Sequence, residues 1–172
     1  MRSVVENKIC RTIKYFGYGA NASSDMMEVI IGRKPSGFIA WLEDYELWIQ
    51  SWREISPSVR KILKNSWTLN FRTYCVSPKR GRKVKGYVWL LTPEERRLVS
   101  KWEFWYQPIK TRVRTQGGGL ITAETEIVKR HSLHKSELDS ERYKFFLNNK
   151  KQMLKIAKLS RGREEFKKYR EK

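Results

Sequence analysis

Residues 13–31 pass from a strand pattern into a helix pattern with only a tight turn between them. Residues 13–18 form an apolar run that predicts a strand, and the turn formers Gly19 and Asn21 follow it. Residues 23–25 are all types favoured at a helix N-cap, so a helix is expected directly after the turn. This junction restricts the fold to one in which a first strand leads at once into a packed helix.

A strand–glycine turn–helix junction has a chemical consequence as well. It directs backbone N–H groups and the positive end of a helix dipole at one point, where an anion can bind. Most junctions of this kind are plain connections, so the geometry alone leaves both interpretations open.

Length and composition limit the remaining choices. The chain has 172 residues, of which 40% are apolar and seven are tryptophan, so it contains enough material for one folded core. We expect a single domain over residues 1–162 and a charged tail over residues 163–172. No apolar run approaches the roughly 20 residues that span a bilayer, and the start lacks a signal-peptide core. Cys10 and Cys75 fit no metal or redox spacing, which favours a reduced, cytoplasmic setting.

The formal net charge of +19 is the least usual property of the composition. It fits a nucleic-acid or other polyanion partner, and it equally fits a protein whose lysines serve solubility. Aromatic residues mostly alternate along expected strands, a spacing that favours core packing over base stacking.

The rest of the chain predicts an α+β fold with prominent antiparallel pairs. Strands are expected at 38–42, 45–52, 67–76, 86–91, 108–115 and 120–129, with a basic loop at 79–85. Helices are expected to end at Gly32, to begin at Ser56-Pro57 and at Thr92-Pro93, and to begin last at Ser140. Charge pairs are expected across the final hairpin, between Lys110, Arg112 and Arg114 on one strand and Glu124 and Glu126 on the other.

Glu103 is the candidate for acid–base chemistry. It stands among Trp102, Phe104, Trp105 and Tyr106 at the end of an expected helix. Apolar surroundings and a helix C-terminus both disfavour the ionised carboxylate, so its pKa is expected to be raised. The plainer interpretation is an exposed glutamate beside a structural aromatic cluster.

The letters of several segments resemble the gamma-glutamylcyclotransferase (AIG2-like) family. Residues 15–22 read Y-F-G-Y-G-A-N-A and are similar to the family's opening signature Y-F-A-Y-G-S-N-L. Residues 86–89 are similar to its G-V-V-W strand, and residues 98–103 match the helix end that carries its catalytic glutamate. Residues 140–143 resemble its P-S-x-x-Y entry to the last helix, so the likeness runs over about residues 13–160.

The resemblance implies a small mixed, largely antiparallel β-barrel flanked by helices. It further implies cyclisation of a γ-glutamyl amine or peptide to 5-oxoproline, with Glu103 as the acid/base and neither metal nor cofactor. It also implies a set of substrate-binding residues: Tyr18, Gly19, Ala20, Asn21, Ala22, Tyr106 and Tyr143.

Three positions depart from the family pattern: Ala20 replaces a serine, Ala22 a leucine, and Phe104 a glycine. An alternative in another class of function therefore stays open. It is a catalytically silent member of the fold that binds nucleic acid or an acidic partner through its basic surface. His131 and His134 form an isolated H-x-x-H pair without a third ligand, which does not predict a metal site.

Overall fold

The computed structural model describes residues 11–63, 72–128 and 143–160. Its strands are β1 (Ile13–Gly17), β2 (Gly37–Ser51), β3 (Arg72–Leu91), β4 (Gln107–Thr115) and β5 (Leu120–Ile127). Its α-helices are α1 (Ser24–Ile31), α2 (Pro57–Leu63), α3 (Pro93–Trp102) and α4 (Lys144–Ser160). Two single 3-10 turns complete the order, η1 (Gly19–Ala22) after β1 and η2 (Trp52–Glu54) after β2.

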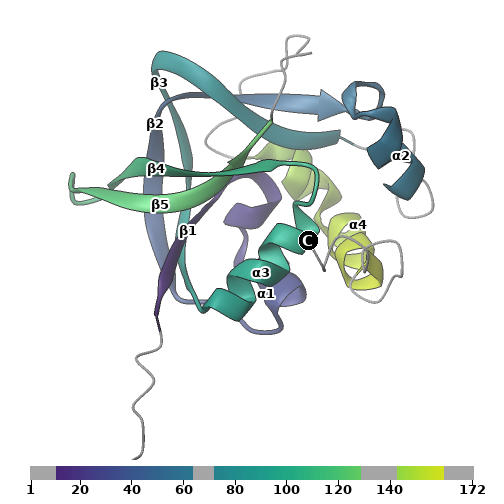
Figure 1. Ribbon diagram of the computed structural model, residues 1–172, viewed down its shortest axis with the longest axis horizontal. Coiled ribbons are helices and arrows are strands. Elements are labelled where there is room, and N and C mark those ends of the chain that lie inside the picture. The colour runs from purple at the N-terminus through teal and green to yellow at the C-terminus, as the bar shows by residue number, and fades with distance from the viewer. Residues whose placement is uncertain (1–10, 64–71, 129–142, 161–172) are drawn as a thin grey trace, which may run out of the picture.

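The strands close into a barrel in the order β1-β3-β2-β4-β5. Neighbouring strands pair antiparallel except at the closure, where β1 meets β5 in parallel at Tyr15 and Glu124. Figure 1 shows α1, α3 and α4 gathered on one side of the barrel, while α2 stands at the far end of β2 and β3. The expected small mixed barrel flanked by helices is confirmed.

The core is built from one face of each strand. Alternation places a set of nearly inaccessible side chains on the inner face of the barrel. This set comprises Phe16, Ala40, Leu42, Val84, Val88, Val113, Ala123 and Thr125. On the outer face of β1 and β3, Tyr15, Trp89 and Leu91 are also buried, because helices cover that side.

The long strands differ from the sequence-based expectation. The expected break at residues 43–44 is absent from β2, and the expected basic loop at 79–85 belongs to β3. One residue of β2, Asp44, faces the four residues 79–82 of β3, so the pair bends without ending. The Asp44 carboxylate accepts a hydrogen bond of 2.8 Å from Gly81 N–H, and both residues have positive φ. Turn-forming residue types therefore mark a large bulge, because pairing resumes on both sides of it.

The helix boundaries near the site follow their local signals. Gly32 ends α1 in the left-handed conformation, with φ of 92°. Thr92 and Glu95 form the expected capping box at the start of α3, and Glu103 is its C-cap. Ser140, the expected start of the last helix, lies outside the described residues, as does the tail at 163–172.

Replacing Gly86 by alanine tests the closeness of β1 and β3. A Cβ at residue 86 would lie 2.4 Å from Gly17 O and 2.6 Å from a ring carbon of Phe16. Because the first of these atoms belongs to the backbone, the two strands must shift, and we expect a loss of about 2 kcal/mol in the free energy of unfolding. Chemical denaturation measures it, with Gly117→Ala as a control, since no atom lies within 4 Å of a Cβ there. Equal stability of the two variants would contradict the packing described.

Candidate active site

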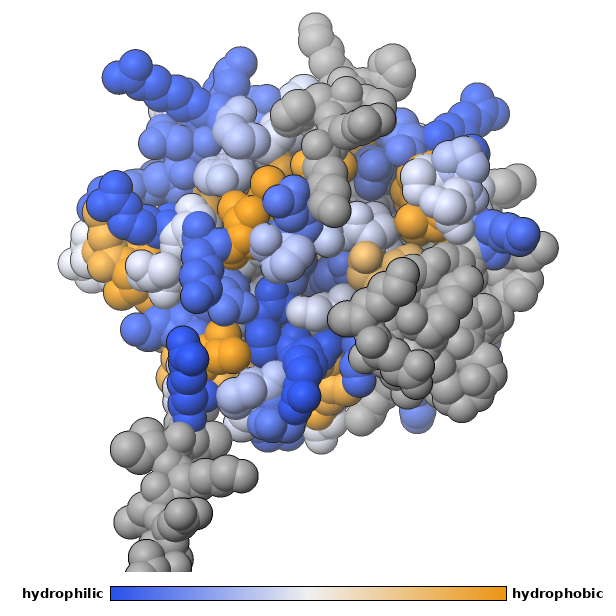
Figure 2. All heavy atoms as spheres, in the orientation of Figure 1, coloured by the Kyte–Doolittle hydropathy of each residue, from blue (hydrophilic) through white to orange (hydrophobic). Residues whose placement is uncertain are grey.

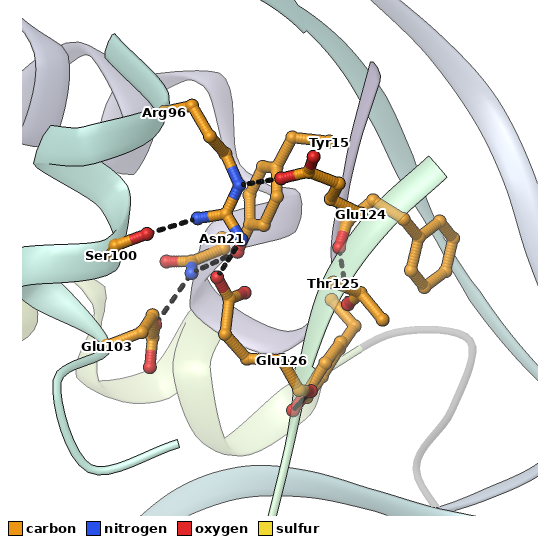
Figure 3. Close-up of polar contacts among 10 residues, drawn as sticks. Tyr15, Asn21, Arg96, Ser100, Glu103, Glu124, Thr125 and Glu126 are labelled. Carbon is orange, nitrogen blue, oxygen red and sulfur yellow. Dashed lines mark hydrogen bonds and ion pairs between the residues drawn. The ribbon is translucent and has the colours of Figure 1, made fainter. Parts of the chain in front are cut away.

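Asn21 joins three separate parts of the chain. Its Nδ2 group donates to the Tyr15 hydroxyl at 2.9 Å and to Glu103 Oε1 at 2.7 Å (Figure 3). Its backbone carbonyl accepts a hydrogen bond of 2.7 Å from the indole N–H of Trp89. The turn η1 is thereby fixed to β1, to β3 and to the end of α3, and the Glu103 carboxylate faces the turn.

Helical spacing explains which side chains of α3 reach the site. Arg96, Ser100 and Glu103 follow one another at intervals of four and three residues, so they share one face of the helix. The backbone N–H of Glu103 still donates to Val99 O at 2.9 Å, which holds this residue at the last turn. The helix therefore delivers one cation and one carboxylate toward the same side of the barrel.

The Glu103 carboxyl has a strongly perturbed affinity for protons. Burial raises its pKa to about 8, and the negative charge of Glu126 adds to the rise. The hydrogen bond from Asn21 and the charge of Arg96 oppose the shift. The direction agrees with the expectation from the aromatic surroundings, and desolvation is its main cause.

Arg96 is the centre of a buried ionic cluster that the sequence reasoning missed. Its Nε donates to Glu124 Oε2 at 2.9 Å, its Nη1 donates to Ser100 Oγ at 2.8 Å, and its Nη2 lies 2.7 Å from Glu126 Oε1. The guanidinium also lies over the ring of Tyr15, 5.0 Å from its centroid. Figure 3 shows Arg96 between the helix α3 and the two glutamates of β5.

The expected charge pairs across the final hairpin are replaced by this cluster. Lys110 is opposite Glu124 in the register of β4 and β5, yet Glu124 and Glu126 both bind Arg96. Arg114 pairs with Glu43 of β2 instead. A buried guanidinium requires anionic partners, and the alternation of β5 presents two carboxylates to the same helix. The spacing of 96, 100 and 103 and of 124 and 126 was readable in the sequence, but their meeting was not.

A small pocket lies beside Glu103. Its volume is about 30 Å³, room for one or two water-sized groups. Its lining comes from β1, η1, β3, α3, β5 and α4: Tyr15, Tyr18, Ala20, Asn21, Arg72, Thr73, Tyr74, Trp102, Glu103, Trp105, Glu126, Phe146 and Met153. The half-buried carboxyl group of Glu103 and the buried one of Glu126 therefore face one small space.

The expected substrate-binding turn is divided between two cavities. Tyr18, Ala20 and Asn21 line the pocket of Glu103. Gly19 and Ala22 line a second, more open groove of about 470 Å³ on the other side of η1. Within η1 the backbone N–H of Asn21 donates to Tyr18 O at 3.1 Å, whereas the first N–H groups of a helix have no partners within that helix.

The two tyrosines expected near the site have structural partners. The Tyr106 hydroxyl donates to Tyr74 O at 3.0 Å and lies 3.0 Å from Thr73 Oγ1. The Tyr143 hydroxyl donates to Lys85 O, and its side chain lines the groove on the far side of η1. Neither is among the residues that line the Glu103 pocket.

The positions that depart from the family pattern affect the pocket to different extents. Ala20 lines it directly. Phe104, at the position of the family's glycine, packs edge-on against Trp105 with ring centroids 5.0 Å apart and does not belong to the lining. Burial raises the pKa of the Cys75 thiol to about 12, so this side chain is a poor nucleophile.

Over residues 11–63, 72–128 and 143–160, no three His, Cys, Asp or Glu side chains are grouped as metal ligands. His131 and His134 lie outside these ranges. Across the same ranges, none of the helices is both long and apolar enough to cross a bilayer.

The basic surface is distributed over the molecule. Lys79, Arg80, Arg82 and Lys83 are exposed at the bulge of β3, and further lysines are exposed along α4. Figure 2 shows hydrophilic groups spread over the visible face between small hydrophobic areas.

Comparison with solved structures identifies the fold. No protein-family model matches the sequence, and no curated protein matches it. The structure matches a solved gamma-glutamyl cyclotransferase with a TM-score of 0.59 and 17% identity, over 93% of this chain and 98% of that one. The chain has the gamma-glutamyl cyclotransferase fold.

Two further solved structures agree with this fold. An uncharacterised human protein matches with a TM-score of 0.59 and 17% identity, over 94% of this chain and 99% of that one. A protein of Arabidopsis thaliana matches with the same TM-score and identity, over 90% and 94% of the two chains. At this identity the likeness concerns the gamma-glutamyl cyclotransferase fold, and activity has to be argued from the site.

Proposed function

We propose that this protein cyclises a γ-glutamyl amine or peptide to 5-oxoproline and releases the amine. The observation that carries the proposal is the contact between the Glu103 carboxylate and Asn21 of η1 at the edge of a small pocket. A buried carboxyl group with a pKa of about 8 is suited to moving protons near neutral pH.

The reaction needs few protein groups. The α-amine of the substrate attacks its own γ-carbonyl carbon, a C–N bond closes the five-membered lactam, and the original amide C–N bond breaks. Glu103 accepts a proton from the attacking nitrogen and donates it to the leaving nitrogen. Because the nucleophile is tethered to the carbonyl, the protein mainly has to fold the substrate into reach. Backbone N–H groups of η1 would hold the α-carboxylate.

The size of the pocket sets a condition on this proposal. About 30 Å³ is far below the several hundred Å³ of a typical small-molecule site, so the substrate requires the lining to open. Three of the lining side chains belong to elements distant from Glu103 in the sequence: Arg72 is exposed at the start of β3, and Phe146 and Met153 belong to α4. These are the side chains that we expect to move. Changes of side-chain rotamer are common on binding.

The direct test is release of 5-oxoproline from a panel of γ-glutamyl amino acids and γ-glutamyl amines. Peptides with an α-linked glutamate serve as controls, because their geometry does not bring the amine to the linked carbonyl. Release from γ-linked compounds alone would support the proposal. Absence of release from the whole panel would reject it, and a salt titration with single-stranded nucleic acid would then test the binding alternative.

Replacing Trp89 by phenylalanine is expected to lower the activity more than the same replacement at Trp48. It removes the donor to the Asn21 carbonyl at 2.7 Å, so η1 loses the contact that fixes it to β3. We expect a loss of about 1–3 kcal/mol in stability and about tenfold or more in kcat/KM. Trp48→Phe is the matched control, because its indole donates to Ser77 Oγ at 2.8 Å, away from the Glu103 pocket. Equal losses of kcat/KM in both variants would contradict a positioning role for Trp89.

A further inference from the structure

The pocket beside Glu103 is lined by buried acceptor oxygens whose capacity for hydrogen bonds is not filled. Asn21 Oδ1 is buried and accepts no hydrogen bond from the described residues, and the buried Glu126 carboxylate has only Arg96 and Tyr15 as donors near it. Asn21 is 5% exposed and Glu126 is 3% exposed, so bulk water does not reach them freely. Buried acceptors in this state indicate a missing donor group.

The orientation of Asn21 is fixed by its other contacts. Its Nδ2 group donates to Tyr15 and to Glu103, so Oδ1 is the end that remains without a donor. Arg96 Nη2 lies 2.7 Å from Glu126 Oε1. Burial raises the pKa of Glu126, while the charge of Arg96 and a hydrogen bond from Tyr15 oppose the rise. A carboxylate can accept about four hydrogen bonds, so these neighbours leave capacity at Glu126.

The local charge also favours a cation. Arg96 is shared by Glu124 and Glu126, and Glu103 adds a third carboxyl group within range of its charge. One guanidinium therefore faces three acids, which leaves an excess of negative charge when the carboxylates are ionised. The volume of about 30 Å³ accommodates a water-sized group such as –NH₃⁺.

We propose that Asn21 Oδ1, Glu126 and Glu103 form a subsite for a primary ammonium group. Such a group has three donors and one positive charge, which match the three acceptors and the excess of negative charge. Resting on the function proposed above, the ligand is the α-ammonium of the γ-glutamyl moiety. Glu126 and Asn21 hold this nitrogen next to Glu103, and Arg96 positions Glu126.

Paired ligands test the subsite without turnover. In the Glu103→Gln background, calorimetry compares L-γ-glutamylethylamide with N-ethylglutaramate, which differs only by lacking the amine. We expect the amine to improve binding about tenfold or more. Adding Glu126→Gln should remove this preference and leave the affinity for N-ethylglutaramate within about twofold, which also shows that the pocket is intact.

Glu124→Gln is the matched control for Glu126→Gln. Glu124 binds the same guanidinium from the same strand, yet it does not line the pocket. The preference for the amine should persist in this variant. Equal binding of the two ligands in the Glu103→Gln background would show that the pocket holds only water, and would overturn the subsite even if the wild type releases 5-oxoproline.

A second measurement tests the ammonium subsite even if the proposed function is wrong. If neither ligand binds, methylammonium is titrated against ¹⁵N-labelled wild type, with the Asn21 side-chain amide as the reporter. A saturating shift that Glu126→Gln abolishes would support the ammonium subsite without γ-glutamyl chemistry. No shift in the wild type would overturn it.

Discussion

Replacing Glu103 by glutamine is expected to abolish the release of 5-oxoproline. Glutamine keeps an oxygen that accepts the hydrogen bond from Asn21 Nδ2, now 2.7 Å long, but it cannot take up or give a proton. A lost general acid–base group typically lowers the rate by about 10²–10⁴-fold. The change removes proton transfer but keeps the size and shape of the side chain, so kcat should fall by far more than KM rises.

The assay for Glu103→Gln requires a variant of similar chemistry on the same helix. Glu94→Gln is suitable, since Glu94 begins α3 and its side chain is 71% exposed beside Arg97. It should retain wild-type activity. If Glu103→Gln keeps more than about a tenth of the wild-type kcat, the acid–base role assigned to Glu103 is wrong.

The activity should rise with pH through the pKa of Glu103. Glu103 must be ionised to accept a proton, and burial with the charge of Glu126 raises its pKa to about 8. We expect kcat/KM to increase about tenfold per unit below that value and to level off above it. The profile of Glu103→Asp, which retains a titratable group, is the comparison. A flat profile between pH 6 and pH 9 would contradict this assignment.

The same shift predicts the pH dependence of stability. The ordinary pKa of 4.5 applies in the unfolded chain and about 8 in the folded protein, so between these values the folded state binds the extra proton. The contribution of Glu103 to the free energy of unfolding is therefore largest below about pH 4.5. It decreases by a few kcal/mol, in order of magnitude, as the pH rises toward 8. Glu103→Gln removes this loss and should be more stable than wild type at pH 8 in urea denaturation. A variant less stable than wild type at that pH would contradict the burial of an ionisable Glu103.

The gain in stability and the loss of activity come from one cause. A carboxyl group held away from water is costly to ionise, and that cost is also what brings its pKa close to that of an amine. Positions that trade stability for a functional group are expected at an active site. Observing both effects in the same variant would separate a catalytic Glu103 from a merely structural one.

Local patterns in the sequence were sufficient for the junction and the helix boundaries. The strand–turn–helix order at residues 13–31, the capping box of Thr92 and Glu95, and the glycine turn of the last hairpin all depend on neighbours within a few positions. The sequence predicts a loop at residues 79–85, whereas in the structure only residues 79–82 leave the strand pairing, as a bulge. The local sequence does not indicate whether strand pairing resumes after such an interruption.

The sequence by itself determined that Glu103 ends a helix among aromatic residues and that a tight turn with Gly19 and Asn21 follows the first strand. Only the tertiary structure decided that Asn21 reaches Glu103, 82 residues away, and that Glu126 and Arg96 join them. The parallel closure of β1 on β5 brings these segments together. Spacings of two, three and four residues specify which face a side chain occupies, whereas the partner on that face depends on how the barrel closes.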